Sequence, residues 1–195
     1  MNTSMHSASA LLLTEQWLTI LSNLGRASAT IKAYRSALTH FFAFCEIHDI
    51  APERASFEDI AGYIRPQLPD MPSSVASATL QLRLSALRLW YDFLVYQDIC
   101  SLNPLPRSGL PGAIYTGRGL IPRINRLPVI HDDGEWLRFL KHVSAAPLRD
   151  RLMLALAYYG ALRRTEVTAL RLEDIDLAHR LIRIRAETTK NRRER

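Results

Sequence analysis

The sequence predicts a mainly helical protein. We expect an amino-terminal bundle of four helices, a basic linker, and a second unit of helices with the start of a β-hairpin. Apolar residues recur every three or four positions through most of residues 1–100, which is the helical period. Residues 104–128 contain five of the ten prolines and four of the eight glycines, which favours an extended connection. Residues 181–185 alternate apolar and basic side chains, as strands do.

The first three helices are predicted from apolar stripes and from signals at their ends. The first helix carries an apolar face and ends near Gly25, and the second begins at Ser28, whose side chain is expected to cap it. Ser56 and Asp59 resemble a capping box that opens a short third helix, which runs to Arg65. The two stripes consist of Trp17, Ile20, Leu21 and Leu24, and of Ile31, Tyr34, Leu38, Phe41, Phe42 and Cys45.

A long fourth helix is predicted after a turn that is rich in proline. The pair Asn103-Pro104 is expected to close this helix, so that residues 1–104 form one small all-α domain. Residues 105–128 are the predicted linker, which either lies along a phosphate backbone or serves as a solubilising spacer. The apolar side of the fourth helix consists of Leu80, Leu84, Leu87, Tyr91 and Leu94.

Residues 129–195 form the predicted second domain. Asp132 and Glu135 suit the start of a helix, and Pro147 suits the first turn of the next one. The group His131-Asp132-Asp133 is therefore interpreted as a helix start rather than a metal site. Gly160 marks a turn, and residues 166–170 are helical again. Residues 187–195 are predicted to be the tip of a hairpin whose return strand is absent.

The charge distribution favours a polyanionic partner. The chain has 25 basic and 19 acidic residues, and the whole excess lies in residues 101–195, because residues 1–100 have 7 basic and 9 acidic side chains. Only three of the basic residues are lysine, and the planar fork of arginine fits phosphate oxygens. Two cysteines cannot form a disulfide framework, and no apolar run reaches the length of a membrane span. We expect an intracellular protein. Its charge indicates nucleic acid as a partner, and codon usage that replaces surface lysine by arginine is the alternative explanation.

One stretch is more specific than any of these patterns. Residues 158–176, YYGALRRTEVTALRLEDID, strongly resemble a block of the tyrosine recombinases, the phage integrases and Xer-type resolvases. Arg163 matches the first catalytic arginine of that family, Glu166 matches the acid three residues later, and Lys190 falls on the lysine of the family's hairpin. Ala161 stands where the family usually has glycine. Residues 29–35 and 79–94 resemble helices of the family's core-binding domain.

The resemblance implies a fold and a reaction. The fold is a SAM-like core-binding bundle followed by a truncated α+β catalytic domain. A tyrosine hydroxyl of the complete enzyme attacks a DNA phosphodiester and forms a 3′-phosphotyrosyl link, with no metal or other cofactor. Arg163 would stabilise charge on the phosphate oxygens, and Lys190 would protonate the leaving 5′-oxygen or clamp a phosphate. Glu166 would orient Arg163 or cap the turn.

The resemblance also implies residues that contact double-stranded DNA. Those on the bundle lie at the starts of the second and fourth helices, and others lie in the linker and the second domain. Gln81 is expected to read a base edge, whereas the cations meet phosphates, and Arg164 is either a backbone contact or plain surface. The candidates are Thr30, Lys32, Arg35, Thr79, Gln81, Arg83, Arg88, Arg118, Arg123, Arg164, Arg192 and Arg193.

Three hypotheses follow for the function. The first is a site-specific recombinase or integrase, represented here by an amino-terminal fragment that cannot cleave DNA alone, because none of the seven tyrosines resembles the nucleophile. The second is a DNA-binding decoy or regulator without catalysis. The third is a helical interaction protein that does not bind nucleic acid. In the first case, other recombinase protomers on DNA are further partners, and no membrane is involved.

Overall fold

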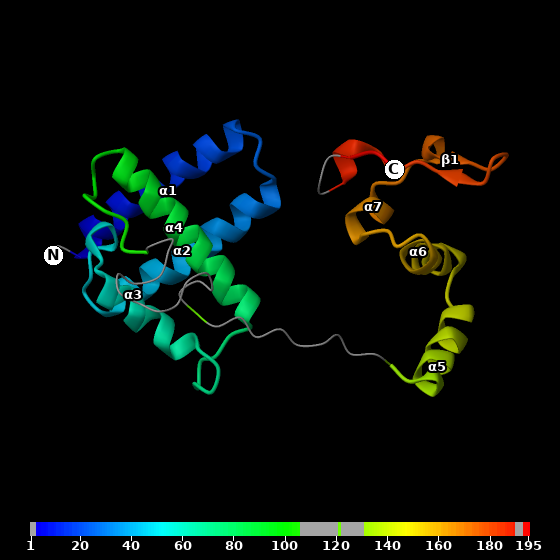
Figure 1. The fold of residues 1–195 in the computed structure, drawn as a ribbon, viewed down its shortest axis with the longest axis horizontal. Helices are drawn as coiled ribbons and strands as arrows, with labels where there is room; N and C mark the ends of the chain where they lie inside the picture. Colours follow the sequence, from blue (N-terminus) through cyan, green and yellow to red (C-terminus); the bar gives the residue numbers. More distant parts are fainter. Residues whose placement is uncertain (1–2, 106–120, 122–130, 190–192) are drawn as a thin grey trace, which may run out of the picture. The chain divides into compact units, whose positions relative to one another are not determined.

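The computed structural model describes residues 3–105, 121, 131–189 and 193–195, and the side chains from Ser9 onward. The chain divides into two compact units, Met1–Arg126 and Leu127–Arg195, and each is described by itself. The described residues are mainly helical, with one short antiparallel pair of strands in the second unit (Figure 1). The expected fold class is therefore confirmed. No helix among these residues is both long enough and apolar enough to cross a membrane.

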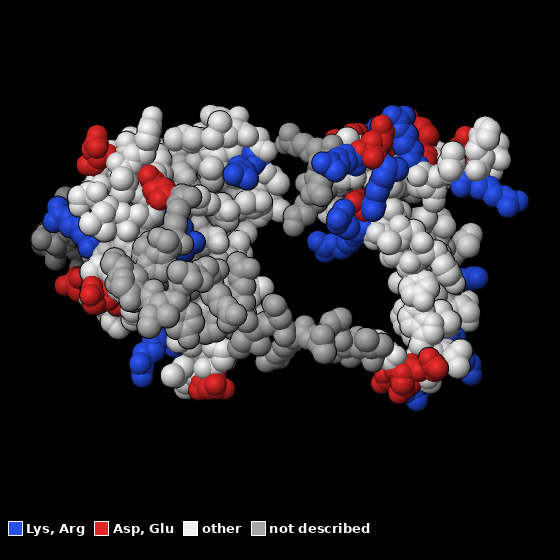
Figure 2. All heavy atoms as spheres, viewed as in Figure 1, with Lys and Arg blue, Asp and Glu red and all other residues white. Residues whose placement is uncertain are grey.

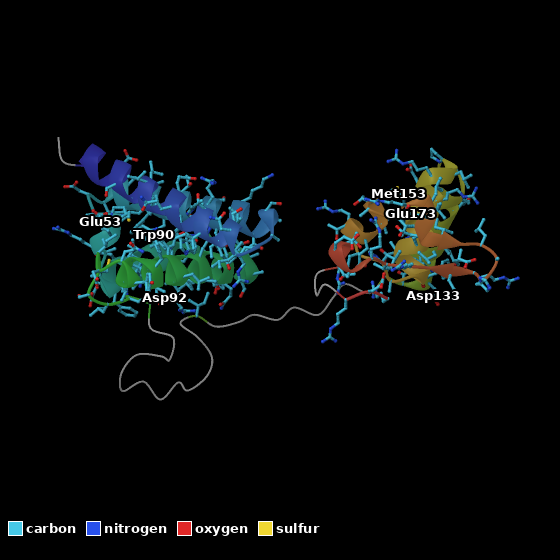
Figure 3. All side chains as sticks on the ribbon, turned by 90° about the horizontal axis from the view of Figure 1, so that it is seen from above. Glu53, Trp90, Asp92, Asp133, Met153 and Glu173 are labelled. Carbon is cyan, nitrogen blue, oxygen red and sulfur yellow. The ribbon has the colours of Figure 1, made fainter. Side chains whose placement is uncertain are left out.

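The first unit is a bundle of four α-helices, as the apolar stripes predict. These are α1 (Thr3–Asn23), α2 (Ser28–Ile47), α3 (Phe57–Ile64) and α4 (Ser77–Tyr96), and short 3₁₀ turns lie at Pro52–Arg54 and Arg65–Gln67. Helix α2 packs against both α1 and α4. Trp90 is fully buried where α4 faces α2, and its ring meets that of Phe42 edge to face, with the centroids 5.2 Å apart (Figure 3). The hydrophobic core of the unit lies between these helices.

The helix-end signals at Gly25 and at Ser56 are confirmed. Gly25 ends α1 with φ at 76°, a left-handed conformation that glycine adopts without steric cost. Ser56 and Asp59 form the predicted capping box, in which the Asp59 N–H donates to Oγ of Ser56 at 3.1 Å. The prediction that Ser28 caps α2 is wrong. Ala27 occupies the cap position and Ser28 is already helical, so no side chain caps this end.

The chain after α4 folds back onto the helix. Helix α4 ends at Tyr96, earlier than the predicted closure at Asn103-Pro104. The Asn103 side chain donates to the Arg88 carbonyl oxygen at 2.9 Å and to Oδ1 of Asp92 at 2.8 Å. Leu105 and Ile121, which belong to the segment predicted as linker, are both buried in the core of this unit. The rest of that segment lies outside the described residues.

The second unit contains α5 (Asp133–Ser144), α6 (Leu148–Tyr159) and the short α7 (Arg164–Thr168). A 3₁₀ turn (Leu172–Asp174) leads into β1 (Ile175–Asp176), which pairs antiparallel with β2 (Leu181–Ile182), and a further 3₁₀ turn follows at Ala186–Thr188. Asp132 caps α5 and forms a capping box with Glu135, as predicted. Pro147 precedes α6 as its cap, one position before the first turn. The strand predicted over residues 181–185 is regular only at its first two residues.

The second unit buries little apolar surface. Neither α5 nor α6 has a fully buried residue, and Leu137, Leu148 and Tyr159 are 65%, 77% and 83% exposed. Ile184 is the buried apolar residue that the structure describes in this unit. Hydrogen bonds and ion pairs between α7 and the hairpin therefore hold this part of the chain together.

Candidate active site around Arg163

A tight turn between α6 and α7 sets the backbone of Arg163. Helix α6 ends at Gly160, where a Cβ would lie 2.7 Å from the carbonyl oxygen of Leu156, so a side chain does not fit without a shift. The next residue, Ala161, is left-handed with φ at 49°, which is strained for an L-amino acid other than glycine. This conformation gives a physical reason for the glycine that the resembling sequences have there. The turn leaves Arg163 as the cap residue of α7.

Glu166 holds both the backbone and the side chain of Arg163. The Arg163 N–H donates to Oε2 of Glu166 at 2.8 Å, and Nη1 of Arg163 donates to Oε1 at 2.8 Å. The Glu166 side chain is inaccessible to solvent, whereas the Arg163 side chain is 53% exposed. Glu166 therefore caps the helix and orients the arginine at once, which unites the two roles expected for it.

A second guanidinium reaches the same carboxylate. Nη2 of Arg195 donates to Oε2 of Glu166 at 2.7 Å. The backbone of Arg195 pairs with Ile184, with N···O distances of 2.7 Å and 3.1 Å. Among the described residues no regular strand follows β2, yet Arg195 already pairs with the residue that lies two positions after that strand.

The hydrogen bonds from Arg163 and Arg195 stabilise the ionised form of the Glu166 carboxylate. The hydrogen bond from the Arg163 backbone N–H, more than any other contact, lowers the pKa of Glu166 from its ordinary value. The guanidiniums of Arg163 and Arg195 lower the pKa further, while burial opposes them. Two cations and one anion leave a positive site at the start of α7, with both guanidiniums about half exposed. Such a site suits a phosphate group.

A second, similar contact ties the hairpin to the other end of α7. Asp174 is buried and accepts a hydrogen bond from the Arg171 N–H at 2.9 Å. Nε of Arg185 lies 3.1 Å from Oδ1 of Asp174, and Nη2 of Arg185 donates to the carbonyl oxygen of Ala169 at 2.7 Å. Sequence reasoning missed Arg185. The spacing of Arg171 and Asp174 repeats that of Arg163 and Glu166 and could have indicated the carboxylate, but it gives no signal for Arg185, which lies 11 residues beyond Asp174.

The other candidates in the second unit are only partly described. Lys190, Arg192, Arg118 and Arg123 lie outside the described residues. Arg164 is exposed at the start of α7, and Arg193 is exposed with its N–H bonded to Oγ1 of Thr189 at 2.9 Å. Figure 2 shows basic side chains gathered on this unit with acidic ones between them.

The candidates on the bundle fall into two groups. Lys32 and Thr79 are exposed, and Thr30 is partly buried, each near the start of its helix; Arg35 is exposed and pairs with Glu15 of α1. Three residues of α4 are more enclosed. Nη1 of Arg83 donates to Oε1 of Gln67, and Nε of Arg88 donates to the carbonyl oxygen of Leu105 at 3.3 Å. Gln81 is partly buried, and its Nε2 atom has no partner among the described residues. Arg83 and Arg88 thus have structural contacts that the sequence did not indicate.

The remaining reactive groups do not form a competing site. Burial raises the pKa of the Cys45 thiol to about 12 and also raises that of Cys100, so neither is an effective nucleophile. Within the described part of the chain, no three His, Cys, Asp or Glu side chains are grouped to hold a metal ion. The group His131-Asp132-Asp133 begins α5, and this confirms its interpretation as a helix start.

Comparisons with known proteins match both units. Residues 14–98 match the family model of the phage integrase, N-terminal SAM-like domain, and residues 132–195 match that of the phage integrase family. A tyrosine recombinase XerC of Thermodesulfovibrio yellowstonii is 27% identical over 168 residues, which are 86% of this chain and 52% of that protein. The XerC of Xanthomonas axonopodis pv. citri is 33% identical over 120 residues, which are 60% of this chain and 36% of that protein.

An integrase from mycobacterium phage Brujita is a structural neighbour, at 20% identity and a TM-score of 0.42, over 89% of this chain and 54% of that one. The chain spans about half the length of the curated relatives it matches. The two family matches together cover well over half of the 195 residues and follow the order of the two units. The comparisons do not favour the alternative of a DNA-binding regulator without catalysis. The chain belongs to the tyrosine recombinases of the phage integrase family, whose members are enzymes.

Proposed function

We propose that this chain supplies the DNA-binding bundle and part of the catalytic site of a site-specific recombinase. In that reaction a tyrosine of the complete enzyme attacks a DNA phosphodiester, and the 3′-phosphotyrosyl link conserves the energy of the broken bond for rejoining. The observation that carries the proposal is the half-exposed guanidinium of Arg163, which is held on a buried, ionised Glu166. In this proposal the complete enzyme works together with other recombinase protomers bound to the same DNA. It acts in the cytoplasm, at the nucleoid.

Arg163 has the geometry to stabilise negative charge that develops on phosphate oxygens. A guanidinium has five N–H donors, and one of them binds Glu166, so others are free for a phosphate. A donor fixed in advance needs no reorganisation during the reaction, and the loss of one such donor typically costs about 3–4 kcal/mol of transition-state stabilisation. Lys190 is proposed as the general acid for the leaving 5′-oxygen, on the ground of its motif.

We further propose that the 195-residue chain binds duplex DNA but does not cleave it. Two of the seven tyrosines, Tyr63 and Tyr91, are buried in the first unit, and burial raises the pKa of both phenols. Tyr91 also donates a hydrogen bond to the carbonyl oxygen of Pro52 at 2.6 Å. These features support packing roles for the two residues. Incubation with supercoiled DNA is expected to give no relaxation and no covalent DNA–protein adduct.

Binding is tested by fluorescence anisotropy with a labelled duplex at increasing NaCl concentration. With about six phosphate contacts, the affinity should fall roughly a thousandfold between about 50 and 200 mM salt. Arg163→Lys and Arg163→Gln separate charge from geometry, because lysine keeps the charge but lacks the planar fork. A salt response close to zero, or covalent adducts formed by the chain alone, would each contradict part of the proposal.

A further inference from the structure

Arg163 and Arg195 share one buried carboxylate. Glu166 accepts from Arg163 through Oε1 at 2.8 Å and from Arg195 through Oε2 at 2.7 Å. Its side chain is closed to solvent, while those of Arg163 and Arg195 are 53% and 48% exposed. Water therefore cannot replace a lost guanidinium at Glu166 without a change in structure. Both arginines, by contrast, keep part of their side chains accessible.

The backbone of Arg195 is itself fixed by the hairpin. Arg195 and Ile184 exchange two backbone hydrogen bonds, and the Arg183 N–H donates to the carbonyl oxygen of Asp174 at 2.8 Å. The Ile184 side chain is buried. The Arg195 side chain thus leaves from an anchored position and reaches a residue that lies 29 positions earlier in the chain.

We propose that Arg195 is a positioning residue for Arg163, acting through the carboxylate of Glu166. Arg163 binds both oxygens of Glu166, through its N–H to Oε2 and its Nη1 to Oε1, so these two contacts can move together with Arg163. Arg195 adds a charged contact to Oε2 from a distant part of the chain, and this contact restrains the carboxylate independently of Arg163. By binding Oε2, Arg195 restrains the carboxylate whose other oxygen, Oε1, orients the Arg163 guanidinium, and it ties the end of the described chain to the start of α7. The inference rests on the proposed function for its importance, since it concerns an arginine proposed to meet the phosphate.

The test uses the 195-residue chain with ¹⁵N-labelled arginine. The Nη1–H signal of Arg163, the group that binds Glu166, is assigned with Arg163→Lys and reports how firmly the guanidinium is held. In Arg195→Gln, exchange of this proton with water is expected to rise by about tenfold, the effect of losing one charged hydrogen bond. Arg195→Lys keeps a cation for Glu166 and should restore most of the restraint. Arg171→Gln, which breaks an exposed pair with Glu173, is the matched control and should leave the signal unchanged.

The outcomes separate this inference from the proposed function. An unchanged Arg163 signal in Arg195→Gln overturns the inference, whatever the DNA titration shows. Arg195→Gln could also remove the hydrogen-exchange protection of the Ile184 amide, and Arg195→Lys then provides the test. If the Ile184 amide stays protected in Arg195→Lys but the Arg163 proton exchanges as fast as in Arg195→Gln, the inference is overturned. A wild-type chain that restrains Arg163 through Arg195 but binds no duplex would overturn the proposed function alone.

Discussion

Arg185 joins the hairpin to the carboxyl end of α7, where its Nη2 atom donates to the carbonyl oxygen of Ala169 at 2.7 Å. The same guanidinium binds the buried carboxylate of Asp174. Glu166 holds Arg195 near the start of α7, so the hairpin is fastened at both ends of this helix. A helix of five residues is too short to be stable alone, and we infer that these two contacts maintain it.

Replacement of Arg185 by glutamine is expected to loosen the second unit. The change leaves Asp174 buried without its cation, which costs about 2–3 kcal/mol. Hydrogen exchange of the amides in residues 164–185 should rise by roughly thirtyfold to a hundredfold, since about 1.4 kcal/mol corresponds to a factor of ten. Arg171→Gln breaks an exposed ion pair and should change exchange little. Equal effects of the two substitutions would contradict the role given to Arg185.

Replacement of Ala161 by glycine is expected to stabilise the turn before Arg163. Alanine is strained at φ of 49°, and glycine relieves this strain, with a net gain of about 1 kcal/mol after its greater entropy in the unfolded chain. Amides of α6 and α7 should exchange more slowly. Ala157→Gly, at an exposed position inside α6, is the control and should cost about 1 kcal/mol. Destabilisation by both substitutions would argue against strain at Ala161.

The lowered pKa of Glu166 predicts that the second unit becomes less stable in acid. Its pKa is lower in the folded protein than its ordinary value of 4.5, because the Arg163 N–H and then the two guanidiniums favour the charged form. The unfolded chain therefore binds the proton more readily, and the stabilisation is complete above pH 4.5 and is lost as pH falls through the lower folded value.

Protection of the Ile184 amide, corrected for the intrinsic exchange rate, measures this loss in acid. The pKa of Asp176, in β1, is also lowered, mainly by the hydrogen bond that its carboxylate accepts from the His179 N–H. The pair of strands β1 and β2 therefore contains a second group that titrates in acid. Asp176→Asn removes that group, and the fall in protection should persist. In Glu166→Gln the corresponding fall should disappear. If the pH profile of Glu166→Gln matched that of the wild type, another group would be responsible.

Local patterns predicted much of this fold, whereas distant contacts were beyond their reach. The stripes of α2 and α4 and the capping boxes at Ser56 and Asp132 depend on residues three or four positions apart, so they are visible in the sequence. The prediction that Ser28 caps α2 failed because the helix begins one residue earlier than expected, so that Ala27 occupies the cap position.

The parts of the site differ in the same way. Arg163 and Glu166 stand three residues apart in a recognisable block, and their contact could be expected. The contact from Arg195 to Glu166 spans 29 residues, and it depends on the backbone pairing of Arg195 with Ile184. Arg185 looked like one more basic residue in an alternating strand, yet its side chain is only 15% exposed. A charge that folds onto its own chain cannot be distinguished by composition from one that meets DNA.

The bundle offers a direct test of that distinction, with Lys32 and Arg83 as the two cases. Lys32 is exposed near the start of α2, whereas Arg83 is partly buried and donates to Gln67, which is itself buried. Lys32→Gln should weaken duplex binding at every sequence tested and lower the salt slope by about 0.9, with no change in the free energy of unfolding. Arg83→Gln should destabilise the first unit by about 1–2 kcal/mol, because the Gln67 amide oxygen loses its donor. Urea unfolding followed by far-ultraviolet circular dichroism, beside anisotropy titrations, measures both effects. A lower salt slope for Arg83→Gln with an unchanged free energy of unfolding would instead indicate that Arg83 contacts DNA.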